Sequence, residues 1–266
     1  MSIAKRFHLF LRVLPVLIVL VLIKAGVHAL GYEFMPLDAL VPSLIAGAIF
    51  LIGFLLSQVL GDYREAERMP AEIRTALEAI HDDVLNFSLS EPAVDMAAFR
   101  TTLVNIVEAF DEGLGLKAAH SDLAAAVARV DELSPLFTRL EQLNLSDRFI
   151  VRLKTEQDTL RRSIFRVAYI QKMEFAPSVH VLVQTLVVAI LFVLLFLRTT
   201  GAWESTLILV FVGYMFIYSL MLIAHLDQPF REGEGTVDDV SLFQLREFLA
   251  KIASEDASAR ESDTSA

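Results

Sequence analysis

Four long apolar segments dominate the hydrophobic pattern of the chain. They cover about residues 9–30, 39–60, 179–197 and 205–224. Each is close to the ~20 helical residues needed to cross a hydrocarbon core of about 30 Å. Because lipid offers no hydrogen-bond partners to the backbone, each segment is predicted to be a transmembrane helix.

The stretch between the two pairs of spans, about residues 62–177, has a helical pattern. Its apolar positions recur at steps of three and four, which is typical of packed helices, in three runs: 73–87, 96–114 and 150–167. A further helix is expected over about residues 121–143, with Pro135 as the point of a break or kink. The first and last helices are expected to continue the second and third spans, and Pro70 and Pro177 mark where these continuations would bend.

The sequence therefore predicts an all-α integral membrane protein with a helical-bundle insert and an oligomeric assembly. Five parts are expected: a first transmembrane hairpin over 1–61, a cytoplasmic helical insert over 62–177, a second transmembrane hairpin over 178–225, a cytoplasmic post-membrane segment over 226–253 and a disordered acidic tail over 254–266. The tail is predicted to be disordered because its residues are small, polar and charged. Helical seams with steps of three and four can pair within one chain or between chains.

The distribution of basic residues predicts the orientation of the spans. Basic residues flank the spans at the N-terminus and at both ends of the insert: Lys5, Arg6, Arg12, Arg64, Arg68, Arg74, Arg161, Arg162, Arg166 and Lys172. In the two short hairpin turns, Arg198 is the only lysine or arginine. The positive-inside rule then places both termini and the insert in the cytoplasm. The first apolar segment is too long for the hydrophobic region of a signal peptide.

Composition narrows the chemistry. Hydrophobic residues make up 55% of the chain, the formal net charge is −10 and cysteine is absent. The absence of cysteine excludes disulfides and thiolate metal sites, and no basic face favours nucleic acid as a partner. The sequence contains no phosphate-binding loop, dinucleotide fingerprint, zinc-protease motif or nucleophile elbow. We therefore expect neither an enzyme nor a cofactor, and we expect the lipid bilayer to be the main partner.

Polar and aromatic residues inside the spans are the candidate functional groups. Lys24 lies near the end of the first span, where it could reach the interface with its long side chain or supply a fixed positive charge at the outer mouth of an anion path. Phe50 and Phe54 lie four residues apart on the second span, followed by Gln58. These phenylalanines either face lipid or a neighbouring helix, or they narrow a symmetric pore in which dewetting controls ion passage.

The segment that follows the last span carries the most distinctive motif. It contains Leu226, Asp227, Pro229 and Phe230, followed by acidic residues and a short apolar stretch. This string resembles the corresponding segment of bestrophins, and more closely that of uncharacterised bacterial bestrophin-like membrane proteins. The layout of two spans, a large helical insert, two spans and a tail is also similar, as is the Tyr-, Arg- and Glu-rich exit of the second span over 62–68.

The resemblance implies a homo-oligomer, with five copies as the expected number, around a pore lined by the second span. Phe50 and Phe54 would form the neck, with Lys24 and Gln58 as polar groups of the pore or its mouth, and small anions such as chloride would pass. Localisation in a bacterial inner membrane is expected. The weak calcium candidates are Asp227, Glu232, Glu234, Asp238 and Asp239. The alternative is a non-conducting, membrane-anchored helical scaffold or signal-relay protein, because the insert holds more acidic than basic residues and does not by itself concentrate anions.

Overall fold

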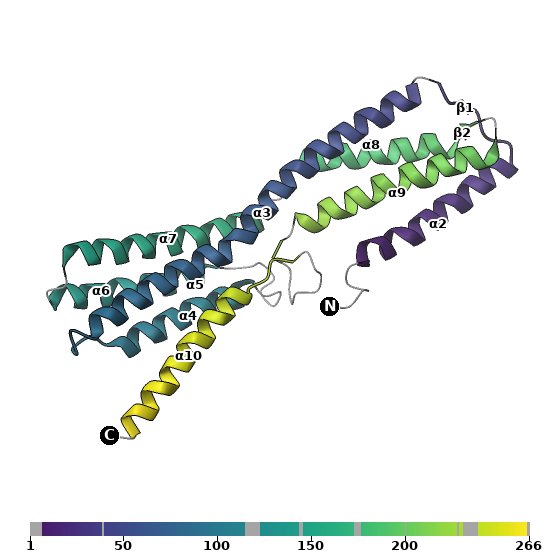
Figure 1. Ribbon diagram of the computed structural model, residues 1–266. Helices are drawn as coiled ribbons and strands as arrows, with labels where there is room; N and C mark the ends of the chain where they lie inside the picture. The colour runs from purple at the N-terminus through teal and green to yellow at the C-terminus, as the bar shows by residue number, and fades with distance from the viewer. Residues whose placement is uncertain are drawn as a thin grey trace. The chain divides into compact units, whose positions relative to one another are not determined.

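The protein is described by a computed structural model that divides into two units (Figure 1). The described residues are 7–38, 40–114, 123–143, 146–172, 177–199, 201–227, 229–230 and 239–264. The membrane unit comprises Met1–Tyr63, Glu174–Pro229 and Thr236–Asp238, and the helical unit comprises Arg64–Met173, Phe230–Gly235 and Asp239–Ala266.

The membrane unit is built from long apolar helices. They are α2 (His8–Ala29), the first part of α3 (Leu40–Ser88), α8 (Pro177–Leu195) and α9 (Ala202–Leu226). Within the described ranges, four helices are long and apolar enough to cross a membrane, and only about a fifth of each apolar window is buried within the chain. The outward-facing apolar surface is what a lipid-embedded protein requires. The protein is an integral membrane protein.

A core of aliphatic side chains and one phenylalanine holds the membrane unit together. Residues of α3, α8 and α9 share this core, among them Ile52, Leu55, Val187, Ile190, Leu209 and Phe216. The helix α2 makes its most extensive contacts with α9, and its Phe10 ring lies 6.1 Å from the ring of Tyr214 in an edge-to-face arrangement. One face of each helix is therefore fixed within the chain, which leaves the opposite faces for lipid or for other copies.

Two very short strands join the two hairpin turns. β1 (Met35–Pro36) pairs in parallel with β2 (Leu197–Arg198), with Met35 opposite Leu197. The Met35 amide also donates a hydrogen bond of 3.1 Å to the Phe196 carbonyl, and Gly31 adopts a φ of 70°, which glycine tolerates without strain. The sequence predicts no strand here, because two residues are too few to produce an alternating pattern.

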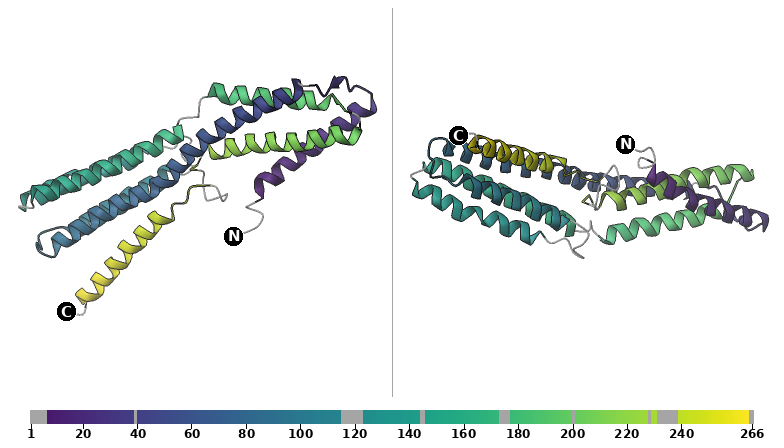
Figure 2. Two further views of the ribbon diagram at one scale, coloured as in Figure 1. Left: turned by 45° about the horizontal axis from the view of Figure 1, so that its top comes forward. Right: turned by 90° about the horizontal axis from the view of Figure 1, so that it is seen from below.

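The helical unit is a bundle with its own core. It contains the remainder of α3 together with α4 (Met96–Leu114), α5 (Ala124–Asp131), α6 (Leu133–Gln142), α7 (Asp147–Lys172) and α10 (Phe243–Thr264). Figure 2 shows α3, α4, α5 and α7 running alongside one another. The buried side chains come from every one of these helices, for example Ile80, Phe110, Val130, Phe137, Leu160 and Phe248. The predicted helices over 73–87, 96–114 and 150–167 are confirmed.

Two of the prolines singled out from the sequence, Pro70 and Pro135, lie inside described helices. α3 continues as a helix through Pro70. The predicted helix over residues 121–143 is broken at Glu132, between α5 and α6. The break precedes Pro135 by one turn, because a proline has no amide hydrogen to donate to the carbonyl four residues earlier. α7 ends at Lys172 and α8 begins at Pro177, and the residues between them lie outside the described ranges.

A buried glutamine stabilises this break. Gln157 of α7 is buried, and its Nε2 donates to the Val130 carbonyl at 2.8 Å and to the Ser134 hydroxyl at 3.0 Å. It thereby satisfies a backbone carbonyl at the α5–α6 junction. This contact explains why a glutamine interrupts the otherwise apolar seam of α7.

The C-terminal segment differs from the prediction. The sequence predicts disorder over 254–266, whereas α10 continues to Thr264. Arg100 of α4 pairs with both Asp256 (2.6 Å) and Glu255 (3.1 Å), and Phe248 and Ile252 of α10 are buried. Composition alone did not indicate this part of the helix, because Glu255 and Asp256 form their ion pairs with Arg100 of the distant helix α4.

Candidate functional site

One face of α3 in the membrane unit is exposed. Phe50 is 73% exposed and Phe54 is 55% exposed. Four smaller residues that share their face are exposed as well: Ser43, Gly47, Ser57 and Gly61. The opposite side of the helix is buried through Ala48, Ile52, Leu55 and Val59. The internal packing of the unit therefore fixes which side of α3 points outward.

The outward face of α3 is unlike that of the other spans. α2 exposes large aliphatic side chains, among them Leu11, Ile18, Val19, Leu22 and Ile23, as expected for a helix in contact with lipid. On the side that carries its two phenylalanines, α3 instead exposes glycines and serines, and Gln58 follows one turn beyond Phe54. A Cβ atom added at Gly47, Gly53 or Gly61 would meet nothing within 4 Å. Packing inside the chain does not require these glycines.

Gln58 lies one turn beyond Phe54 and is exposed. The predicted neck residues Phe50 and Phe54 and the predicted polar residue Gln58 thus all lie on exposed parts of α3. Whether they line a pore depends on other copies of the chain. Their role as pore residues remains a prediction.

Lys24 is enclosed by other parts of the chain. Its side chain is 1% exposed, and its role at the interface or at a pore mouth remains a prediction. The Nζ atom donates to the Leu197 carbonyl at 2.6 Å and to the Leu195 carbonyl at 3.1 Å. The carbonyls in the last turn of a helix lack intrahelical partners, and α8 ends at Leu195, so Lys24 satisfies groups that the end of α8 leaves open.

Glu33 completes this buried cluster, which we call the hairpin-loop cluster (Lys24, His28 and Glu33). Glu33 Oε1 lies 2.7 Å from Lys24 Nζ, and Glu33 Oε2 lies 3.1 Å from Nδ1 of the half-exposed His28. Burial raises the pKa of Glu33, but hydrogen bonds from Lys24 and His28 outweigh this effect and hold the pKa below its usual value of 4.5. The cluster links the end of α2, the first hairpin turn and the end of α8. The Lys24 charge is neutralised locally.

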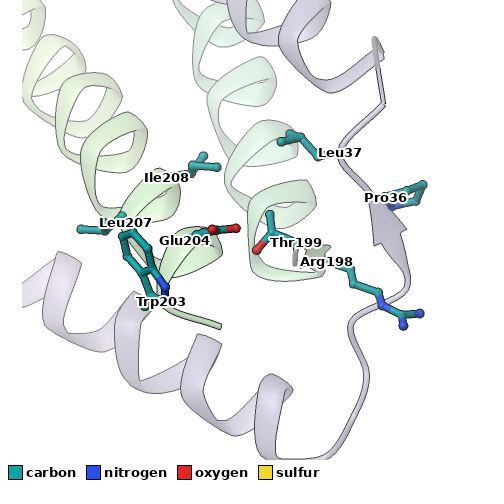
Figure 3. A pocket seen from close by; sticks show the side chains of 8 residues that line it. All are labelled: Pro36, Leu37, Arg198, Thr199, Trp203, Glu204, Leu207 and Ile208. Carbon is teal, nitrogen blue, oxygen red and sulfur yellow. The ribbon is translucent and has the colours of Figure 1, made fainter. Parts of the chain in front are cut away.

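Beside the two short strands lies an open groove of about 920 Å³. Figure 3 shows Thr199, Trp203, Glu204 and Ile208 around it, with the Arg198 guanidinium extending away from Trp203 and Glu204. Trp203 and Leu207 are exposed. A tryptophan and an arginine at the ends of spans are typical of the membrane–water interface. We therefore interpret the groove as a surface in contact with lipid.

The post-membrane motif is divided between the two units. Leu226 is buried in the core of the membrane unit, and the Asp227 amide donates to the Ile223 carbonyl at 2.9 Å to end α9. Phe230 packs against the core of the helical unit, and Pro229 is buried.

Of the calcium candidates, Glu232, Glu234 and Asp238 lie outside the described residues, while Asp227 and Asp239 lie within them. In the part of the chain that the structure describes, no group of three or more histidines and carboxylates could hold a metal ion. The calcium site remains a prediction.

Sequence reasoning identified Lys24 but missed Glu33 as its partner. The signal was available in part, because Glu33 is one of two acidic residues in the first hairpin turn. The two carbonyl partners on α8 left no trace in the sequence, since any residue supplies a carbonyl.

Comparison with solved structures places this fold among bacterial bestrophin homologues. A substituted form of a bacterial bestrophin homologue from Klebsiella pneumoniae superposes with a TM-score of 0.73 at 16% identity, covering 94% of this chain and 98% of that one. Another structure of such a homologue from the same organism gives a TM-score of 0.70 at 18% identity, over 92% and 94% of the two chains. A crystal structure of a membrane protein gives 0.71 at 17% identity, over 95% and 100%. No family model matches the sequence, and no curated protein matches it.

At these identities the comparison establishes the fold. The chain has a bestrophin-like fold over nearly its full length, which confirms the resemblance predicted from the post-membrane motif and the layout of the spans.

Proposed function

We propose that the chain forms an oligomeric, bestrophin-like ion channel whose pore is lined by α3. The observation that carries this proposal is the exposed face of α3, where two exposed phenylalanines are flanked by exposed glycines and serines. A Cβ atom added at Gly47, Gly53 or Gly61 would meet nothing within 4 Å. Small residues on a span favour close contact with another helix, and serine or glutamine side chains favour water over lipid. Both preferences are met if several copies of α3 surround a pore.

The bestrophin resemblance supports a ring of five copies. In such a ring Phe50 and Phe54 would form two aromatic layers about 6 Å apart along the helix axis. A narrow apolar constriction controls ion passage by excluding water. Gln58 would follow the neck as the first amide side chain that an ion meets.

The proposal also covers the orientation of the chain in the membrane and the ion that passes through the pore. The basic residues around the insert support a cytoplasmic location for both termini and the helical unit, with the hairpin turns on the outer side of the inner membrane. Chloride and other small anions are the proposed permeant ions. Lys24 would contribute by holding the ends of α2 and α8 together, because its charge is already paired with Glu33.

The test measures the number of copies in the assembly and the flux of chloride through it. Light scattering of the purified protein in mild detergent should give a single species of several copies, and liposomes containing it should pass chloride. Phe50→Ala and Phe54→Ala should raise or deregulate this flux. Phe211→Ala is the matched control, since Phe211 of α9 is 74% exposed but lies on another helix.

Three outcomes would contradict the proposal. The first is a monomer that persists in several detergents, and the second is a protein that assembles but conducts nothing. The third is a flux that Phe211→Ala changes as much as Phe50→Ala does. A protein that conducts nothing but captures a partner through its helical unit would support the scaffold alternative.

A further inference from the structure

A fully buried histidine lies between two carboxylates in the helical unit. The His81 side chain of α3 has no exposed surface. Its Nδ1 atom lies 2.9 Å from Oδ1 of Asp82, which is also on α3, and its Nε2 atom lies 3.1 Å from Oε2 of Glu255 on α10. The Phe248 ring of α10 packs against the imidazole in an edge-to-face arrangement, with 6.5 Å between the ring centroids. His81 thus connects α3 to the C-terminal half of α10.

We propose that protonation of His81 controls the docking of the C-terminal half of α10 on α3 and α4. Histidine is the side chain that ordinarily changes its charge near neutral pH, and this change alters the number of hydrogens that the ring can donate. Docking should be complete while the ring is protonated and should weaken as the pH rises and the proton is lost. All the residues involved belong to the helical unit, so the inference does not depend on the proposed channel function.

The number of N–H groups on the ring decides how many of its neighbours it can bind. An imidazolium carries two N–H groups and can donate to both carboxylates, whereas a neutral imidazole carries one and presents a lone pair to the other. If Glu255 loses its donor, α10 loses a direct contact with α3. If Asp82 loses its donor, the affected carboxylate is the one that also accepts a hydrogen bond of 3.1 Å from Lys251 of α10. Deprotonation therefore weakens the attachment of α10 in either tautomer.

The charged groups around His81 favour its protonated form. Burial raises the pKa of Asp82, but hydrogen bonds from His81 and Lys251 outweigh this effect and hold the pKa below its usual value of 3.8. Among the described residues, the ion pairs that join this part of α3, α4 and α10 contain two cations and three carboxylates: Arg100, Lys251, Asp82, Glu255 and Asp256. The imidazolium supplies the positive charge that balances them, and a buried charge is tolerated where it is paired in this way.

Other ion pairs along this part of α3 do not involve His81. Asp83 pairs with Arg152 of α7 at 2.9 Å. Arg74 lies two turns before His81 and pairs with Glu247 in the N-terminal half of α10. The N-terminal half of α10 is therefore attached to α3 independently of the imidazole, and loss of the proton should act on the C-terminal half.

Spin labels on the purified protein in detergent measure this docking directly. The chain contains no cysteine, so nitroxides can be attached at Thr101→Cys on α4 and Ala257→Cys on α10, which are both exposed positions. Electron paramagnetic resonance should give one short distance between the labels at about pH 6. The population at this distance should fall about twofold or more at about pH 8.5, because a charge-assisted hydrogen bond is lost. Equal distance distributions at the two pH values would overturn the proposal.

Two pairs of variants assign the pH response to His81. His81→Gln should remove the response, whereas His180→Gln, on α8 of the membrane unit, should keep it. Glu255→Gln changes the same contact from the side of α10 and should reduce the response. Its matched control is Glu247→Gln, because Glu247 pairs with Arg74 instead. A response that persists unchanged in His81→Gln or in Glu255→Gln would overturn the proposal, and if His81→Gln does not fold, the two glutamate variants decide.

Discussion

Lys24 and Glu33 form a buried ion pair with 2.7 Å between Nζ and Oε1, in a segment where a charged group is expensive. The pair is viable because Lys24 also donates to two backbone carbonyls, that of Leu195 at the end of α8 and that of Leu197 on β2. The cluster joins three segments of the membrane unit that are distant in sequence. It acts as a structural connection between the two hairpins.

Removing the Lys24 charge should destabilise the membrane unit. Lys24→Met keeps the length of the side chain but leaves Glu33 and two carbonyls without their donor, and we expect a loss of about 3 kcal/mol, typical of breaking one side of a buried pair. The melting temperature of the purified protein in detergent measures this effect. Lys154→Met is the control: Lys154 and Glu141 form an exposed pair, whose loss should cost about 0.5 kcal/mol. Equal effects of the two substitutions would contradict the structural role of Lys24.

The same cluster predicts an acid limit to stability. The pKa of folded Glu33 is lowered from 4.5, so its contribution to stability is complete above the pKa of the unfolded chain and is lost as the pH falls through the folded value. The melting temperature should therefore drop below about pH 4.5. In Glu33→Gln this component of the drop should be absent, and stability at neutral pH should be lower. Parallel pH profiles for the natural protein and the variant would contradict the pairing.

The C-terminal helix should be measurably ordered beyond Ser254. Hydrogen–deuterium exchange should show protection over residues 254–258 in the natural protein. Arg100→Ala should speed exchange there, since Arg100 pairs with Glu255 and Asp256. Arg129→Ala serves as control because Arg129 pairs within three residues, with Glu132. Exchange at the rate of an unstructured peptide in the natural protein would restore the predicted disordered tail.

Two glycines of the membrane unit should respond in opposite ways. A Cβ atom at Gly47 would meet nothing within 4 Å, whereas one at Gly213 would lie 3.4 Å from Leu191 and 3.6 Å from Leu17. Gly47→Leu should therefore leave the fold of a single chain intact but disrupt assembly, because Gly47 lies on the exposed face of α3 that carries Phe50 and Phe54. Gly213→Leu should lower the melting temperature, because overpacking a buried contact costs about 1–3 kcal/mol. Light scattering and thermal unfolding separate the two effects. Assembly that survives Gly47→Leu unchanged would argue against α3 as the contact between copies.

Much of the fold could be predicted because it depends on long runs of apolar residues or on apolar residues at regular helical spacing. The four apolar spans and the helices over 73–87, 96–114 and 150–167 each rest on ten or more residues of consistent spacing. The bestrophin-like architecture was indicated by a short motif whose Leu226 and Phe230 prove to be packed in the two cores. These features depend on residues close together in sequence.

The features that were missed depend on residues far apart. The partner of Lys24 on α8 is a pair of backbone carbonyls 171 and 173 residues away. The β1–β2 pairing involves two residues from each strand, too few for an alternating pattern. The final turns of α10 are held by Arg100, more than 150 residues earlier. The role of Phe50 and Phe54 depends on a further step, the association of separate chains.

Cysteine accessibility tests the central claim, that α3 lines an ion pathway, most directly. The chain contains no cysteine, so single substitutions can be labelled without background. We predict that a charged, water-soluble thiol reagent blocks chloride flux through Ser57→Cys, whose position lies on the exposed face of α3 that carries Phe50 and Phe54. The same reagent should leave Ala189→Cys on α8 unaffected; both positions are exposed in the single chain. Flux that persists in labelled Ser57→Cys, or that is blocked equally in Ala189→Cys, would contradict a pore lined by α3.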